Sequence, residues 1–327
     1  MNRLFFCLLI GITFIGCESP KRDYQNTEKE IVKIQLPEFD ADSAYFFLVK
    51  QVEFTPRIPN TKAHRDCAEF LINTLKRYAD TVINMPIVAK AYNGTPLNGQ
   101  NIVGVFNPEA RRRILLAAHW DSRPYADHDP DPVNRRTPID GANDGASGVA
   151  VLLEIARQLH LNPVEIGIDI VFFDLEDYGA PQDERAVGGD DFWCLGSQAW
   201  AKNPHVKNYQ AIYGILLDMV GGKNAQFSKE GISMQYAPDV VEKVWYRAQL
   251  LGFGSYFINK ETPPILDDHW YVNIGTNIPM IDIIEYDATS NTGFNKHWHT
   301  LSDNLDNIDK ETLAAVGKVV LSVVRSE

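Results

Sequence analysis

The chain has 327 residues, 45% of them hydrophobic, and a formal net charge of −12. This length can bury the core of one large α/β domain. The acidic balance, without any basic run, argues against nucleic acid as a partner.

The first 17 residues, MNRLFFCLLIGITFIGC, resemble a secretion signal. A short basic start precedes an apolar stretch that is too short to span a bilayer. Gly16 before Cys17 resembles a bacterial lipobox, in which Cys17 carries the lipid anchor; an ordinary signal that is cut elsewhere is the alternative. Residues 18–36 are polar and are expected to form a tether. We therefore expect the protein in the bacterial cell envelope, facing the periplasm or the outside. Residues 37–327 are expected to form one domain, and the protein is expected to be a monomer.

Strand-like and helix-like segments alternate through this domain. In chain order, the expected elements are helices at 40–54 and 61–79, strands at 81–91, 101–107 and 113–121, a helix at 145–161, a strand at 166–177, a helix near 196–203, a strand at 211–220, a helix at 238–252, a strand at 277–286 and a helix at 310–326. This alternation predicts a three-layer α/β/α fold, in which helices cover both faces of a mixed, mostly parallel sheet. Cys67 and Cys194 are the only cysteines in this domain; the sequence does not decide whether they pair, and they form no zinc–thiolate motif.

Polar residues follow three of the predicted strands at their carboxyl ends. His119 and Asp121 follow one strand, Glu176 and Asp177 the next, and Asp218 a third. In open α/β sheets the carboxyl ends of the strands form the crevice that binds ligands. These side chains are therefore expected to meet at one edge of the sheet.

Each of these residues, taken alone, has a structural explanation. A single Asp before a helix, such as Asp144, usually caps that helix, and His119 alone would be a buried structural histidine. Together, however, so many carboxylates and imidazoles would repel one another unless a cation or shared protons offset the charge. Asp, Glu and His without thiolates favour zinc in a catalytic site with open coordination.

Several motifs resemble the zinc aminopeptidase superfamily when they are taken in order. They are AAHWDS, GANDGASGV, FFDLED, LLDMVG and HWHT. Within that superfamily the chain is more similar to the animal-type glutaminyl-peptide cyclotransferases, through PQD at 181–183, DDH at 267–269 and WHTLSDN at 298–304. The resemblance covers about residues 40–325. It implies an α/β/α fold with a sheet of mixed direction.

The resemblance also implies roles for individual residues. Asp144, Asp177 and His299 match three zinc ligands, and Glu176 matches the general acid/base. The animal enzymes usually have Glu where this chain has Asp177, so the shorter side chain requires the backbone to approach the metal.

Other matched positions surround this centre. Asp218 and Asp267 match two acids that form a hydrogen-bonded network with the general acid/base, and Trp298 and Phe294 match aromatics that line the substrate pocket. A tryptophan that the family places just before PQD is absent here. Trp193, in the inserted segment ERAVGGDDFWCLGS, is the expected replacement; the alternative is a loop tryptophan that pins this segment to the surface.

The implied reaction converts the N-terminal glutamine of peptides or proteins into pyroglutamate and releases ammonia, with one zinc ion. The alternative is a two-zinc aminopeptidase, because all five ligands of such a site are present: His119, Asp144, Asp177, Asp218 and His299. The sequence cannot count the zinc ions. The aromatic-rich loop and the DDH motif favour the cyclase, since hydrolysis needs neither. A binding module with a vestigial site is disfavoured because no catalytic position is lost.

Overall fold

The computed structural model describes residues 36–184 and 191–327. The predicted signal, residues 1–17, and all of the predicted tether except Leu36 lie outside the described residues. The expected boundaries of these segments therefore stay predictions. None of the helices in the described part of the chain is long and apolar enough to cross a membrane.

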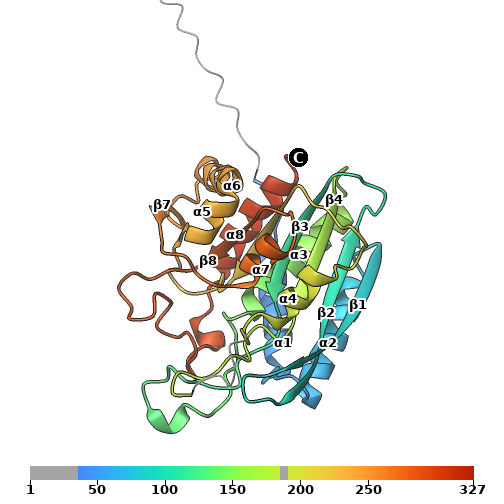
Figure 1. The fold of residues 1–327 in the computed structure, drawn as a ribbon. Helices are drawn as coiled ribbons and strands as arrows, with labels where there is room; N and C mark the ends of the chain where they lie inside the picture. Colours follow the sequence, from blue (N-terminus) through green and yellow to red (C-terminus); the bar gives the residue numbers. More distant parts are fainter. Residues whose placement is uncertain (1–35, 185–190) are drawn as a thin grey trace, which may run out of the picture. The chain divides into compact units, whose positions relative to one another are not determined.

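A six-stranded sheet forms the centre of the described chain (Figure 1). Its strands, in spatial order, are β1 (Thr81–Lys90), β2 (Pro96–Phe106), β4 (Gly167–Phe173), β3 (Arg113–His119), β5 (Tyr213–Asp218) and β8 (Met280–Ile284). Strands β4, β3, β5 and β8 run parallel, whereas β2 is antiparallel to both of its neighbours. The predicted mixed, mostly parallel sheet is confirmed.

Helices cover both faces of this sheet, because its central strands are apolar on both sides. In β3, Ile114 and Leu116 pack into one core, and the alternating residues Leu115 and Ala117 pack into another. The first core includes residues of α1 (Ala41–Val52), α2 (Lys62–Leu75), α3 (Ala146–Leu161), α6 (Pro238–Leu250) and α8 (Lys310–Val324). The second includes residues of α4 (Leu195–Lys202) and α7 (Asp268–Gly275).

Six short elements are not among the sequence predictions. They are α7, the 3-10 helices η1 (Pro132–Asn134) and η2 (Leu305–Asn307), the helix α5 (Gly231–Tyr236), and the strands β6 (Phe227–Lys229) and β7 (Phe257–Glu261), which pair in a small second sheet. Strand β6 has only three residues, which is too short for a hydrophobic period to show. Side chains define the start of α5 and α7, since Glu230 and Asp267 cap them.

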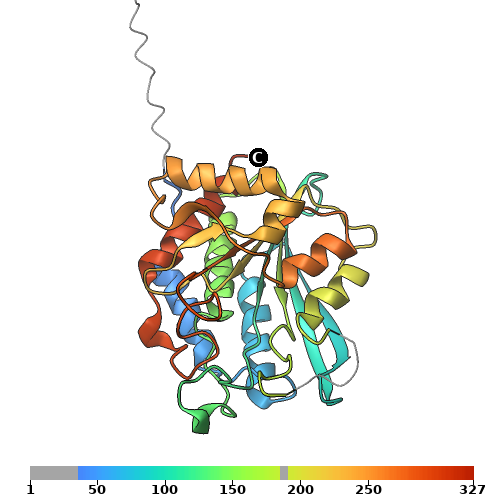
Figure 2. The ribbon, with the colours of Figure 1, turned by 60° about the vertical axis from the view of Figure 1, so that its left-hand side comes forward.

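Two long loops meet at the carboxyl end of the parallel strands. Figure 2 shows the segment after β3 (green) beside the segment that leads into α8 (red). Hydrogen bonds join them, from His128 N to His299 O at 3.1 Å and from Ala142 N to Asp303 O at 3.3 Å. This contact brings His299, the second histidine of the HWHT motif, to the sheet edge where the predicted polar residues lie.

Candidate active site

The parallel strands and their loops deliver the predicted polar residues to one place. His119 is the last residue of β3 and Asp218 the last of β5, while Glu176 and Asp177 follow β4 closely. Asp144 stands one residue before Gly145, which is the N-cap of α3. The Asp144 carboxylate therefore does not cap this helix, contrary to the usual role of an Asp at such a position.

The backbone of this site is unusual. Among the described residues, eight that are not glycine have a positive φ, and four of these are asparagines, which tolerate the left-handed conformation. The other four flank the site: Leu175 (φ 59°), Cys194 (54°), Met219 (49°) and His299 (53°). Left-handed backbone at such residues costs free energy and tends to concentrate at functional sites.

Asp144, Asp177 and His299 form one group that can hold a metal ion. One potential ligand atom from each lies within 4.8 Å of the others. His299 Nε2 is 3.5 Å from Asp144 Oδ2 and 3.3 Å from Asp177 Oδ1. All three residues are buried, with 4%, 1% and 2% of their surface exposed.

His119, Asp144 and Asp218 form a second such group. His119 Nε2 lies 2.9 Å from Asp144 Oδ1 and 3.2 Å from Asp218 Oδ1. Asp144 belongs to both groups and offers a different oxygen to each. The two groups could therefore hold one or two metal ions, and the geometry does not fix the number of ions.

The chemistry of these atoms fits a divalent cation. Asp144 Oδ2 and both carboxylate oxygens of Asp177 are buried and have no hydrogen-bond partner in the described chain. Buried carboxylates without partners are costly, and a metal ion offsets that cost. Carboxylate and imidazole ligands without thiolates match a catalytic zinc site.

Arg123 and Asp127 support His299 from behind. Asp127 Oδ1 faces His299 Nδ1 at 3.4 Å. Arg123 donates two hydrogen bonds to the Asp127 carboxylate, at 2.9 and 2.8 Å, and another to the backbone oxygen of Asp177 at 3.0 Å. Burial works against a charged Asp127, but Arg123 and His299 outweigh it and hold the pKa of Asp127 well below its usual range. A charged carboxylate behind a histidine orients the ring for metal binding.

Two further carboxylates hold the backbone of the ligand loops. Asp121 accepts hydrogen bonds from the backbone N–H groups of Glu176, at 3.1 Å, and Asp177, at 3.2 Å. Asp303 accepts from Asn143 N at 2.7 Å and Asp144 N at 3.2 Å. These bonds fix the two loops that carry the predicted acid/base and two predicted ligands.

Glu176 lies between His119, which belongs to the second candidate metal-binding group, and the buried carboxylate of Asp267. Its Oε2 is 3.9 Å from His119 Nδ1, and its carboxylate forms a compact group with Cys194 and Asp267. Burial, followed by the nearby carboxylates of Asp177 and Asp267, raises the pKa of Glu176 well above its usual range, although His119 opposes this shift. A carboxyl group with raised proton affinity suits proton transfer at neutral pH.

A cavity of about 370 Å³ opens beside these groups. Its lining residues are Asp144, Glu176, Asp177, Asp191, Trp193, Asp218, Met219, Ile265, Leu266, Asp267, Ile284, Phe294, Trp298 and His299. The Trp298 ring stacks on the His299 imidazole at 3.7 Å between ring centroids and contacts Phe294 at 4.6 Å. Aromatic and aliphatic walls around a few charged groups are typical of a small-molecule pocket.

Trp193 occupies the space beside Gly179. A Cβ atom added at Gly179 would clash with the indole ring of Trp193. The indole lies parallel to the His299 imidazole, with an interplanar angle of 7° and 6.2 Å between centroids, and the Arg123 guanidinium lies 4.5 Å from the ring centroid. The Trp193 side chain thus reaches the cavity that Phe294 and Trp298 also line.

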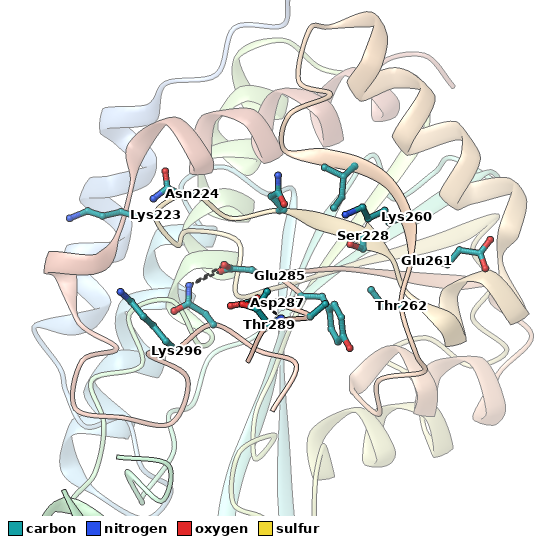
Figure 3. Close-up of a pocket in the computed structure, with 15 residues that line it drawn as sticks. Lys223, Asn224, Ser228, Lys260, Glu261, Thr262, Glu285, Asp287, Thr289 and Lys296 are labelled. Carbon is teal, nitrogen blue, oxygen red and sulfur yellow. Dashed lines mark hydrogen bonds between the residues drawn. The ribbon is translucent and has the colours of Figure 1, made fainter. Parts of the chain in front are cut away.

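A second cavity of about 430 Å³ is lined by residues of β6, β7 and the segment that follows β8 (Figure 3). Glu285 lies in its interior and accepts a hydrogen bond from Asn295 Nδ2 at 3.0 Å, drawn as a dashed line. Burial raises the pKa of Glu285 to about 7, although Asn295 opposes the shift. None of the predicted site residues lines this cavity.

The sequence predictions miss several residues of the site. They give no role in the site to Arg123, Asp127, Asp303 or Cys194, or to His128, whose ring packs on Trp298 with 4.5 Å between centroids. No local pattern marks these residues, because a spacing of four residues brings side chains together on a helix, whereas Arg123 and Asp127 lie in a loop. Cys67 and Cys194, whose pairing the sequence does not decide, are both free thiols.

Fold and site together define a class of protein: a metal-dependent α/β/α enzyme whose active site lies at the carboxyl edge of a mostly parallel sheet. The chain belongs to peptidase family M28, whose family model matches residues 101–324.

Two solved structures and one curated protein show which members of this family the chain is similar to. Glutaminyl cyclase of Tannerella forsythia is 56% identical, with a TM-score of 0.87 over 89% of this chain and 100% of that one. A Zn-dependent exopeptidase from Parabacteroides distasonis is also 56% identical, with a TM-score of 0.88 over 90% of this chain and 100% of that one. Glutaminyl-peptide cyclotransferase of Gloydius blomhoffii is 28% identical over 248 residues, which are 67% of this chain and 63% of that protein. The chain thus spans slightly less than two thirds of the length of this curated relative.

Proposed function

We propose that this protein is a zinc-dependent glutaminyl-peptide cyclotransferase that acts on peptides or proteins with an N-terminal glutamine. The observation that carries the proposal is that Glu176 and a candidate metal-binding group line one cavity, which three aromatic rings also line. The 56% identity to a bacterial glutaminyl cyclase supports it.

The cavity and its rings prepare the substrate. Cyclisation is intramolecular, because the α-amine of glutamine attacks the carbonyl of its own γ-amide, so the site has mainly to bend the side chain back on itself. Trp193, Trp298 and Phe294 line the space available for this bent side chain. These aromatic walls also exclude water, which would otherwise compete as a nucleophile.

Asp144, Asp177 and His299 would hold the zinc ion, with His299 oriented by Asp127. When bound, zinc polarises a carbonyl group and stabilises the negative charge that develops on its oxygen. Glu176 accepts a proton from the attacking amine and passes it to the departing ammonia. Asp218 and Asp267 are the two acids that assist this proton transfer; burial raises the pKa of Asp218 to about 7, so Asp218 can hold a proton near neutral pH.

A two-zinc aminopeptidase is the second candidate. The His119, Asp144 and Asp218 group favours it, because this group could hold a second ion that shares Asp144 with the first. The similarity to a Zn-dependent exopeptidase favours it as well. Hydrolysis would then use Glu176 as the base that takes a proton from the attacking water.

Substrate preference, metal content and two variants separate these candidates. The purified protein should release ammonia from glutamine-bearing peptides and leave alanine and leucine anilides intact. His299→Ala should lose both zinc and turnover, whereas Glu176→Gln should keep zinc and lose turnover, because it removes a proton carrier but no ligand. Steady anilide hydrolysis with two tightly held zinc ions per chain would instead establish the peptidase.

We further propose that the protein is exported and held at a membrane by lipid on Cys17. The support is the sequence of residues 1–17, with Gly16 directly before Cys17. Full-length protein should sediment with the membrane fraction, and Cys17→Ala should release it or leave it unprocessed. Wild-type protein that is entirely in the soluble fraction would contradict the anchor.

A further inference from the structure

Cys194 touches the predicted general acid/base from the side away from the cavity. Its Sγ lies 3.3 Å from Glu176 Oε1, in a geometry that allows the thiol to donate a hydrogen bond. Cys194 is fully buried and, unlike Glu176, does not line the substrate cavity. The thiol can therefore act on the reaction through Glu176 without lining the substrate cavity itself.

The backbone fixes this contact. Cys194 N donates to Glu176 O at 2.9 Å, and Leu195 N donates to Leu175 O at 3.0 Å, so the start of α4 is bonded to the loop that follows β4. Cys194 and Leu175, one residue from each of these two bonded pairs, both have left-handed backbone. The pairing does not depend on a flexible side chain reaching across solvent.

In the part of the chain that the structure describes, no other side chain or backbone group donates a hydrogen bond to the Glu176 carboxylate. Oε2 faces His119 Nδ1, but at 3.9 Å this contact is too long for a hydrogen bond. The remaining near neighbours are carboxylates, including Asp267. Burial, together with the Glu176 charge, raises the pKa of Cys194 well above its usual range, so the group remains a thiol and keeps its proton to donate.

We propose that Cys194 is a positioning residue, whose S–H group holds Glu176 Oε1 and leaves Oε2 to carry the proton in the reaction. The proposal rests on the proposed cyclase function. A thiol is a weak donor. It can fix the orientation of a carboxyl group without occupying the oxygen that has to exchange a proton.

The test compares variants of the two buried free thiols. Cys194→Ala should lower kcat about tenfold with KM and bound zinc little changed, because the substrate and the metal do not touch the thiol. Cys194→Ser restores a donor and should recover most of kcat. Cys67→Ala is the matched control, since Cys67 is equally buried but packs in the apolar core, and its kcat should stay at the wild-type level. Wild-type kcat in Cys194→Ala, or loss of zinc together with turnover, would overturn the proposal.

Infrared spectroscopy gives a readout that requires no reaction. The S–H stretching band of Cys194 should lie at the lower frequency of a hydrogen-bonded thiol and should move upward in Glu176→Ala, while the Cys67 band stays in place. A Cys194 band at the frequency of a free thiol in the wild-type protein would overturn the proposal even if the Cys194 variants fail to fold. Wild-type protein that cyclises no glutamine peptide would refute the proposed function instead, and the infrared result would remain valid.

Discussion

His299 depends on a carboxylate that lies behind it and touches no substrate. Asp127 faces His299 Nδ1 at 3.4 Å and is itself held by Arg123. Asp127→Asn should therefore weaken zinc binding about 10- to 100-fold, the usual effect of losing the partner of a metal-binding histidine. Zinc affinity measured by competition with a chelator tests this. Asp183→Asn, which breaks an Arg–Asp pair on the surface, is the control and should leave zinc affinity unchanged. Equal affinities of the two variants would show that Asp127 plays no part in binding.

Glu285, in the second cavity, should make stability depend on pH. Its pKa rises from 4.5 to about 7 on folding, so the native protein binds more protons than the unfolded chain between these values. The free energy of unfolding should fall as pH increases through this window, by at most about 3 kcal/mol from this group. Glu285→Gln keeps an acceptor for Asn295 and should be increasingly more stable than the wild type as pH rises toward 8.

Urea unfolding of both proteins at several pH values measures that difference. Glu261→Gln is the control, because Glu261 lines the same cavity but is exposed. A Glu285→Gln variant that shows the same pH dependence as the wild type would contradict the shift.

Single residues of the site could be predicted to different degrees. Asp144, Asp177 and His299 stand in motifs, and the fold brings them together. Cys194 and Asp127 escape prediction, because their roles come from contacts with Glu176 and His299 that exist only once the chain has folded. No local pattern marks such partners, since 18 residues separate the first pair and a long stretch of sequence separates the second.

The segment around Trp193 and the loop that carries Gly179 form one packed unit. Because a Cβ at Gly179 would clash with the indole, Gly179→Ala should displace the ring from the cavity. Trp193→Ala and Gly179→Ala should each lower kcat/KM for glutamine peptides by the packing of one ring, on the order of 1–3 kcal/mol or roughly 5- to 150-fold.

The double variant distinguishes this mechanism from two independent effects. Once the ring is gone, Gly179→Ala has nothing to displace, so the double variant should be no worse than Trp193→Ala alone. Bound zinc and the melting temperature should change little in all three proteins. Additive losses, or a Trp193→Ala protein that melts much earlier but turns over normally, would assign Trp193 to stabilising the loop.

Elements with a long hydrophobic period were predictable, and short elements were not. The final helix, expected at 310–326, spans Lys310–Val324, and the strand expected at 113–121 spans Arg113–His119. In contrast, α7 has eight residues and begins at a cap that is also the predicted catalytic Asp267. A helix of eight residues is too short to show a clear hydrophobic period, and its cap is also a predicted site residue, so periodicity alone does not predict this helix.

At the scale of the whole chain, the alternation of strands and helices predicted the mixed sheet and its two covered faces, because parallel strands need helical crossovers. The order of the strands could not be read from the sequence. Strand β4 lies between β2 and β3, although it comes after both in the chain, and contacts between distant segments decide this. The same order places the ends of β3, β4 and β5 next to one another and so creates the site.

The mass of the product from one peptide with an N-terminal glutamine distinguishes cyclisation from hydrolysis of the peptide bond. Zinc-loaded wild-type protein is incubated with the peptide, and Glu176→Gln protein serves as the control for spontaneous cyclisation. Cyclisation should give a full-length peptide that is lighter by one ammonia, formed much faster with the wild-type protein than with Glu176→Gln. Free glutamine together with a peptide shorter by one residue would contradict it and would show that the site hydrolyses the peptide bond.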